Sequence, residues 1–143
     1  MKPNFHDKEY ILTDKISYRL HTPVRGDVVI FKAPVNPDVD YIKRVIGIPG
    51  DKVKVQNGTP FVNGEKLKED YLVDQTFLFP GSFMAEGVEI IVPEGKIFVM
   101  GDNRSHSSDS RQFGPININS VVGRAFLRYW PINSIGVIPE VHY

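Results

Sequence analysis

The sequence contains no cysteine among its 143 residues, and it contains no long apolar run. The absence of cysteine excludes disulfide bonds, thiolate nucleophiles and zinc sites with cysteine ligands. The apolar runs are short, as in "VVIF" at residues 28–31. Neither a signal peptide nor a span of about 20 apolar residues therefore lies within the sequence. The 17 basic and 17 acidic residues cancel, so no strong positive field favours nucleic acid as a partner.

Proline and glycine are frequent, and they divide the sequence into short β-rich runs. There are 11 prolines and 12 glycines, and no long segment shows a clean helical period. Asn57-Gly58 and Asn63-Gly64 are typical of tight turns, because both residue types tolerate positive φ. We therefore predict one mainly antiparallel β domain, with helix limited to short turns such as one near residues 119–121. The predicted strands are Val28–Lys32, Tyr41–Ile48, Lys52–Val55, Val88–Val92, Lys96–Met100 and Val122–Trp130.

The stretch "DYIKRVIGIPGD" (40–51) places two cations next to each other in an apolar strand. Successive strand residues point to opposite faces, so Lys43 shares a face with Tyr41 and Val45. The residues expected on the other face are Ile42, Arg44, Ile46 and Ile48. Arginine keeps its charge in proteins, whereas a desolvated lysine can lose its proton. Lys43 is therefore a candidate base, although a strand lysine more commonly extends to water.

The most polar stretch, "KIFVMGDNRSHSSDSRQFGP" (96–115), follows an apolar strand. A strand that ends in glycine, followed by Asp, Asn, Arg and Ser, can present a site on a loop. The same composition is typical of a solvated loop whose side chains cap their own backbone. A third interpretation joins the loop to Lys43, because a neutral lysine can act as general base for a serine while a second hydroxyl orients the amine.

Two other kinds of site can be considered for this loop. A Ser-His-Asp triad would use Ser105 or Ser107, His106, and Asp102 or Asp109. Adjacent loop residues rarely point at one another, so this arrangement is disfavoured. Calcium loops need oxygen ligands at alternate positions, and the pattern fails because positions 104 and 106 are arginine and histidine. The four histidines, at positions 6, 21, 106 and 142, show no metal-binding spacing.

Three stretches together resemble the type I signal peptidases, the membrane-anchored serine/lysine proteases that remove signal peptides from exported proteins. They follow the family's order with compact spacing, and they are "RGDVVIF" (25–31), "DYIKRVIGIPGD" (40–51) and "MGDNRSHSSDSRQFGP" (100–115). The short spacing resembles the smaller Gram-positive enzymes, which lack a large inserted β domain. The resemblance implies that residues 1–143 form a catalytic domain of antiparallel β-sheets in a partly open barrel, with very little helix.

The resemblance also assigns roles to matching positions. Lys43 would be the general base, and Ser107 would orient its amine. Asp109 and Arg111 would form a supporting ion pair behind the site, with Asp102 nearby. Three residues would lie on the strand that pairs with a substrate peptide: Asp40, Tyr41 and Ile42. The resemblance implies no cofactor and no metal, and its implied partners are the signal-peptide regions of preproteins and membrane lipid rather than nucleic acid.

The nucleophile of the family lies in a box that reads Ser-x-Ser-Met-x-Pro, and the second serine attacks the substrate. Met1 and Pro3 match the end of this box, so the nucleophile is expected immediately before Met1. Ser17 and Ser82 do not match that position. We therefore expect the 143-residue chain by itself to be inactive. The resemblance further implies a single-pass anchor upstream, which would hold the domain at the outer face of the bacterial cytoplasmic membrane.

Other functions stay open on the sequence alone. A non-catalytic peptide-binding or assembly module of the same fold would fit the missing serine, whereas the presence of Lys43 and Ser107 favours catalysis. A self-cleaving regulator with a Ser/Lys dyad would require a DNA-binding domain and a basic surface, and the sequence has neither. The apolar stretch "FLFPGSFM" (77–84), with residues 129–131, either covers the open end of a barrel or contacts lipid.

Overall fold

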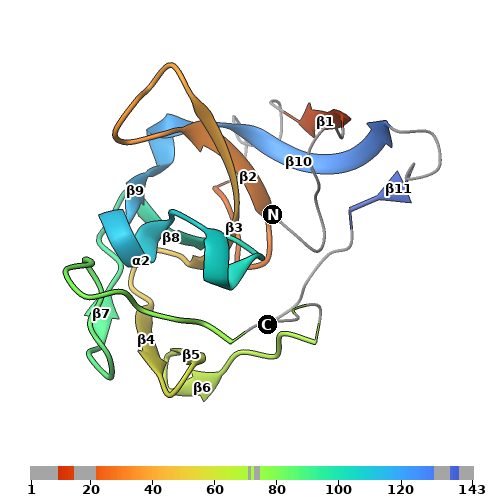
Figure 1. The fold of residues 1–143 in the computed structure, drawn as a ribbon. Coiled ribbons are helices and arrows are strands. Elements are labelled where there is room, and N and C mark those ends of the chain that lie inside the picture. Colours follow the sequence, from red (N-terminus) through yellow and green to blue (C-terminus); the bar gives the residue numbers. More distant parts are fainter. Residues whose placement is uncertain (1–9, 15–21, 71, 73–74, 131–135, 139–143) are drawn as a thin grey trace.

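Two antiparallel sheets make up most of the structure, a computed structural model that describes residues 10–14, 22–70, 72, 75–130 and 136–138 (Figure 1). The larger sheet contains β1 (Tyr10–Asp14), β2 (Val28–Lys32), β3 (Asp40–Gly47), β8 (Lys96–Met100), β9 (Ile116–Asn117), β10 (Val121–Trp130) and β11 (Gly136–Val137). Its strand order is β1-β10-β2-β3-β8-β9, with β11 paired to β10. The smaller sheet contains β4 (Lys52–Gln56), β5 (Thr59–Val62), β6 (Glu65–Lys66) and β7 (Ile90–Ile91), in the order β6-β5-β4-β7.

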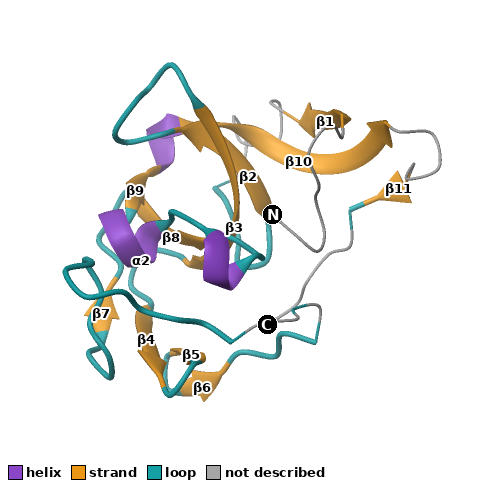
Figure 2. Ribbon diagram, viewed as in Figure 1, coloured by secondary structure: helices purple, strands orange, loops and turns teal. Residues whose placement is uncertain are grey.

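The predicted mainly β architecture is confirmed, and helix in the described part of the chain is confined to single turns (Figure 2). The turns are α2 (Ser110–Phe113) and two 3₁₀ turns, Arg104–His106 and Ile118–Ser120. Strand pairing among the described residues gives two open sheets rather than a closed barrel. None of the described helices is long and apolar enough to cross a membrane.

Most predicted strands are present, with small shifts at their ends. The strands predicted at Val28–Lys32 and Lys96–Met100 have the predicted bounds. The strand predicted at Val88–Val92 is shorter, because only Ile90–Ile91 pair with β4. The two Asn-Gly pairs form the predicted tight turns, with positive φ at all four residues. The list of predicted strands did not include β5, which lies between the two Asn-Gly turns, nor β1, β6, β9 and β11.

The central strands of the larger sheet, β3 and β8, are covered on both faces. One face packs against the smaller sheet, where Ile46 and Phe98 meet Val53 and Val55 in a buried cluster. The other face carries a second cluster, whose buried members are Val29, Phe31, Val45, Ile97, Val99 and Ile116. Buried apolar surface on both sides makes these two strands rigid supports for whatever follows them in the chain.

The strand β3 contains an irregularity that changes the face of its last residues. Its register against β8 shifts between Val45 and Gly47, as in a β-bulge. As a result Ile48 packs with the cluster around Val29 and Val45 rather than on the face of Ile46. The expectation that Ile48 shares a face with Ile42 and Arg44 was therefore wrong, because strict alternation does not continue through a bulge.

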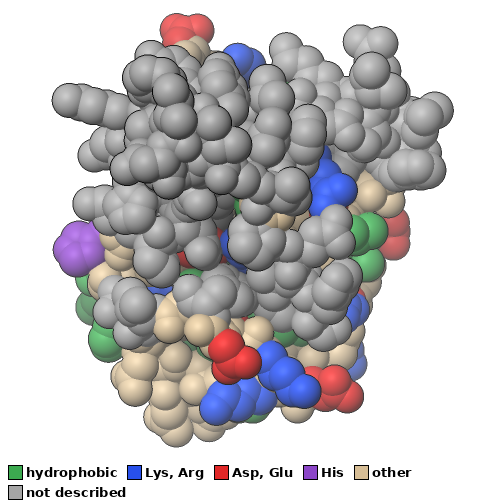
Figure 3. All heavy atoms as spheres, turned by 90° about the vertical axis from the view of Figure 1, so that its right-hand side faces the viewer, with side chains coloured by type: hydrophobic (Ala, Val, Ile, Leu, Met, Phe, Trp, Pro, Cys, Tyr) green, Lys and Arg blue, Asp and Glu red, His purple; other side chains and the backbone are tan. Residues whose placement is uncertain are grey.

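Charged side chains of both signs lie together on the visible surface of the smaller sheet. At the lower end of the face shown in Figure 3, described basic and acidic side chains are neighbours. This mixed surface agrees with the equal numbers of basic and acidic residues in the chain.

Gly47, at the end of β3, leaves no room for a side chain against Val53 of the smaller sheet. A Cβ atom there would lie 2.9 Å from Val53 Cγ2 and 3.1 Å from Val92 Cγ2. Gly47→Ala is therefore expected to lower the free energy of unfolding by about 1–3 kcal/mol, as overpacking of a core does. Chemical denaturation of residues 1–143 measures the change. Gln56→Ala, at an exposed position of β4, is the control and should change stability little; an equal effect of both variants would contradict the tight approach.

Candidate active site

Lys43 lies near the middle of β3, on the same face as Tyr41 and Val45, as predicted. Across the sheet it pairs with the fully buried Val29 of β2. The Tyr41 ring centroid lies 5.3 Å from Lys43 Nζ. Burial lowers the pKa of the Lys43 ammonium, and this exceeds the opposing effect of Asp109 and Asp102, which raise it. The side chain is thus placed where a lysine loses its proton more easily than in water.

Ser107 lies beside Lys43, and a glycine makes room for it. Ser107 follows the 3₁₀ turn Arg104–His106 in extended conformation. A Cβ atom at Gly101 would lie 2.0 Å from Ser107 Oγ and 3.6 Å from Lys43 Cδ. The serine hydroxyl and the lysine side chain therefore pack against the same glycine.

The Ser107 hydroxyl is buried and makes no hydrogen bond to the described residues. A buried hydroxyl without a partner is costly, and such groups in native structures commonly have a functional reason. Ser107 lies next to Lys43, whose pKa is lowered, but no hydrogen bond joins its hydroxyl to the Lys43 amine, so the orienting role stays a prediction.

Asp109 and Arg111 form the ion pair that the sequence analysis expected. Arg111 Nε and Nη2 donate to Asp109 Oδ1 and Oδ2, both at 2.8 Å, and both side chains are buried. Asp109 also caps α2, since it accepts from Arg111 N at 3.1 Å. Its second oxygen accepts from Gly101 N at 3.0 Å. The pair therefore connects α2 directly to the glycine that faces Ser107 and Lys43.

Asp102 pairs with a residue that the sequence analysis did not assign to the site. Arg44 Nε and Nη2 donate to Asp102 Oδ1 and Oδ2 at 3.0 and 2.8 Å, and both side chains are almost completely buried. Arg44 Nη1 also donates to the Gly26 carbonyl at 3.0 Å. Arg44 therefore ties the start of the polar loop to β3, from the face opposite Lys43. Two adjacent cations in one apolar strand were the signal that could have indicated this pair.

A third buried arginine, Arg104, contacts residues far away in the sequence. It donates to the Gly101 carbonyl, to Thr76 Oγ1 and to both carboxylate oxygens of Glu69. No sequence pattern distinguished Glu69 or Thr76 from other surface-type residues, so the sequence analysis missed both.

The alternative Ser-His-Asp triad does not fit this geometry. His106 is exposed, and its Nδ1 lies 2.8 Å from Ser105 Oγ. The two candidate carboxylates, Asp102 and Asp109, each bind an arginine through both oxygens. Among the described residues, no group of three His, Cys, Asp or Glu side chains could hold a metal ion.

The three candidate substrate-binding residues lie at the start of β3, where one edge of the strand is open. On one side β2 pairs with Asp40–Arg44, whereas on the other side β8 pairs only from Arg44 onward. No described strand pairs with this second edge at residues 40–43. Asp40 is exposed, and Ile42 packs partly against the buried Val28. An extended peptide can add to such an edge through main-chain hydrogen bonds.

Some expected positions lie outside the described residues. These are Met1, Pro3 and Ser17, together with the histidines at 6, 21 and 142.

Comparison with known proteins gives one consistent family. The sequence profile described as "Signal peptidase, peptidase S26" matches residues 1–130. A signal peptidase I of Bacillus caldolyticus is 42% identical over 138 residues, which cover 92% of this chain and 75% of that protein. A probable signal peptidase I-2 of Synechocystis sp. is 37% identical over 146 residues, and this chain spans 63% of its length. A crystal structure of a signal peptidase I from Enterococcus faecalis matches with a TM-score of 0.60 and 34% identity, covering 73% of this chain and 97% of that one.

The Asp109–Arg111 pair is expected to contribute strongly to stability. Asp109→Ala leaves a buried guanidinium without its counter-charge, which typically costs about 3–5 kcal/mol. Chemical denaturation of residues 1–143 measures this loss. Asp40→Ala is the matched control, because Asp40 pairs with Lys32 at 2.8 Å while both side chains are about half exposed. Such a pair is worth about 1 kcal/mol or less. Similar losses in the two variants would show that the buried pair does not support the loop.

Proposed function

This chain belongs to the signal peptidase family, peptidase S26, and from that membership we propose that residues 1–143 form the catalytic domain of a serine endopeptidase. The proposed substrates are exported preproteins, and the bond cleaved is the one that joins the signal peptide to the mature protein. The proposed location is the outer face of the bacterial cytoplasmic membrane, with a single-pass anchor in the protein that carries this chain.

The observation that supports the proposal best is the position of Lys43. Its amine is desolvated on an apolar strand face, and its side chain packs with Ser107 against Gly101. A general base must be neutral before it can accept a proton, so a lowered pKa at this position suits the chemistry. Ser107 would orient the amine, and the Asp109–Arg111 pair would hold the peptide of Gly101 in place.

In the proposed reaction, neutral Lys43 removes the proton from the hydroxyl of a serine nucleophile. The serine oxygen attacks the scissile carbonyl, and the protonated Lys43 gives its proton to the amine of the mature protein as the amide bond breaks. The mature protein leaves, the signal peptide stays bound to the serine as an acyl-enzyme, and Lys43 is neutral again. Lys43 then activates a water molecule, which releases the signal peptide. The family motif puts the nucleophile immediately before Met1, and that placement stays a prediction. The substrate would add to the open edge of β3 at Asp40–Lys43.

Activity should depend on Lys43 as a base rather than as a cation. The test protein carries this chain behind a Ser-x-Ser segment and an anchor helix, and the substrate is a preprotein with alanine at the first and third positions before the cut. Lys43→Arg keeps the charge but cannot accept a proton, so kcat should fall by about 10²- to 10⁴-fold. The rate should rise with pH, with an apparent pKa below the ordinary lysine value of about 10.4.

Lys52→Arg, at an exposed position of β4, is the control and should keep the parent activity. Substantial cleavage by the Lys43→Arg protein would contradict the proposed role of Lys43 as the general base. Binding of signal peptides without cleavage by the parent protein would instead favour a non-catalytic peptide-binding module.

We further propose that the segment 77–84 contacts membrane lipid. Phe77, Phe79 and Phe83 are about half exposed, at 48%, 59% and 53%. Exposed aromatic side chains that follow closely in the sequence can form an apolar patch, and such patches bind the boundary between headgroups and acyl chains. The segment is attached to the site through its backbone, since Arg111 donates to the Phe77 carbonyl at 2.8 Å.

Replacing these three phenylalanines by serine should weaken binding of the chain to phospholipid vesicles at least severalfold, because buried apolar area drives such binding. Vesicle co-sedimentation measures the change. Val35→Ser is the control, since Val35 is a highly exposed apolar residue, at 89%, that lies outside the segment. Unchanged binding of the triple variant would contradict lipid contact by this surface.

A further inference from the structure

Gly101 is held at both of its backbone hydrogen-bonding groups by buried charged side chains. Its N–H donates to Asp109 Oδ2 at 3.0 Å, and its carbonyl accepts from Arg104 Nε at 2.9 Å. Gly101 is also the residue whose missing side chain leaves room for Ser107 Oγ beside Lys43. A shift of this glycine would therefore move the environment of both side chains.

Arg104 is in turn held by a segment that lies outside the polar loop. The guanidinium is completely buried. Its Nη1 donates to Glu69 Oε2 at 2.9 Å and to Thr76 Oγ1 at 2.7 Å, and its Nη2 donates to Glu69 Oε1. Bidentate pairing of this kind fixes the plane of the guanidinium, and with it the direction of Nε. The orientation of the donor to Gly101 is thus set by Glu69 and Thr76.

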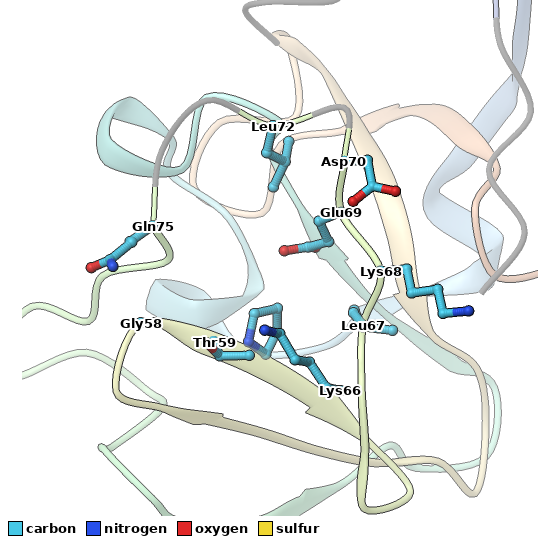
Figure 4. Close-up of a pocket in the computed structure, with 10 residues that line it drawn as sticks. Gly58, Thr59, Lys66, Leu67, Lys68, Glu69, Asp70, Leu72 and Gln75 are labelled. Atoms are coloured by element: carbon cyan, nitrogen blue, oxygen red, sulfur yellow. The ribbon is translucent and has the colours of Figure 1, made fainter.

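The position of Glu69 agrees with this internal contact. Glu69 lines a pocket of about 590 Å³ beside the smaller sheet, and it points to the opposite side from its neighbour Lys68 (Figure 4). The Glu69 side chain is only 12% exposed. A carboxylate that leaves water in this way is stabilised only if its partner has good geometry.

We propose that Glu69 is a positioning residue of the candidate active site, acting through Arg104 on Gly101 and so on Ser107 and Lys43. The proposal rests on the function proposed above for Lys43 and Ser107. It gives the loop a second brace: Asp109–Arg111 holds the N–H of Gly101, and Glu69–Arg104 holds its carbonyl.

A matched ion pair elsewhere in the fold provides the control. Arg25 Nε and Nη2 donate to Asp51 Oδ2 and Oδ1 at 2.7 and 2.8 Å, and Asp51 is buried. Asp51 also accepts from Ile48 N and Asn63 Nδ2, so its contacts lie at the end of β3 and not in the polar loop. Asp51→Asn should therefore reduce stability without changing the surroundings of Lys43.

The first measurement follows the Lys43 amine directly, without any need for activity. Lysine labelled with ¹³C at Cε reports the titration of each amine in the 143-residue chain, and Lys43→Arg identifies the Lys43 signal. In Glu69→Gln the loosened loop should admit water, so the pKa of Lys43 should rise toward the ordinary lysine value. Thr76→Val should shift it in the same direction by less, and Asp51→Asn should leave it unchanged.

The second measurement uses cleavage by the protein that carries the Ser-x-Ser segment. Glu69→Gln should lower kcat by about 2- to 30-fold, the usual range for residues that act through a network, with KM little changed. The acidic limb of its pH profile should move to higher pH, which a purely structural role would not cause.

If Glu69→Gln does not fold, Thr76→Val tests the proposal in its place. It removes the hydrogen bond from Arg104 to Thr76 Oγ1 and leaves the Arg104–Glu69 ion pair intact. An unchanged Lys43 pKa and unchanged kcat in every folded variant would overturn the inference. An equal shift of the Lys43 pKa in Asp51→Asn would also overturn the inference, because a general loss of stability would then explain the shift in Glu69→Gln. A parent protein that does not cleave, or a Lys43→Arg protein that does, counts against the proposed function alone, because the titration still reports on Glu69.

Discussion

Buried pairing of arginine with carboxylate is the interaction on which the polar loop depends. The loop after β8 contributes to three such pairs, Arg44–Asp102, Arg104–Glu69 and Arg111–Asp109. Removing charges from water is costly, and the cost is offset only by close bidentate geometry. The geometry is met in all three pairs. Arg44–Asp102 joins the loop to β3, Arg104–Glu69 joins it to the segment before Thr76, and Arg111–Asp109 lies within the loop itself. A loop of mainly polar residues is thereby held to the strands beneath it by buried ion pairs.

The same pairing helps to explain why burial is the largest influence on the pKa of Lys43. Two carboxylates, Asp109 and Asp102, lie near the amine, and both raise its pKa. Each carboxylate is shared with an arginine. Arg111 itself lowers the pKa of Lys43, so its pair with Asp109 adds little net charge to the site. Desolvation by the apolar face of β3 then decides the direction of the shift.

Local patterns in the sequence were sufficient for much of the fold and for part of the site. Alternation placed Lys43 on the face of Tyr41, and the Asn-Gly pairs marked the tight turns. The bulge after Val45 was missed, although Gly47 within the predicted strand was a signal for it, because an isolated glycine in a strand often marks a bulge. The pairing of charged residues far apart in the chain could not be predicted either. No local pattern indicates that Arg104 pairs with Glu69, 35 positions away, rather than with a nearer acidic residue. The roles of these residues in catalysis stay predictions.

The open edge of β3 has a consequence for where a bound peptide is cut. In the proposed mechanism the strand that would pair with the peptide also carries the base, Lys43. The register of the peptide on β3 therefore determines which of its bonds lies next to the Lys43 amine. One strand residue is about 3.3 Å, and a slip of one residue turns every side chain to the opposite face. A misaligned peptide would therefore present its scissile bond a full residue away from the amine, and each of its side chains would point to the face opposite the correct one. Fidelity of cleavage would then be a property of β-sheet register, fixed before any chemistry begins.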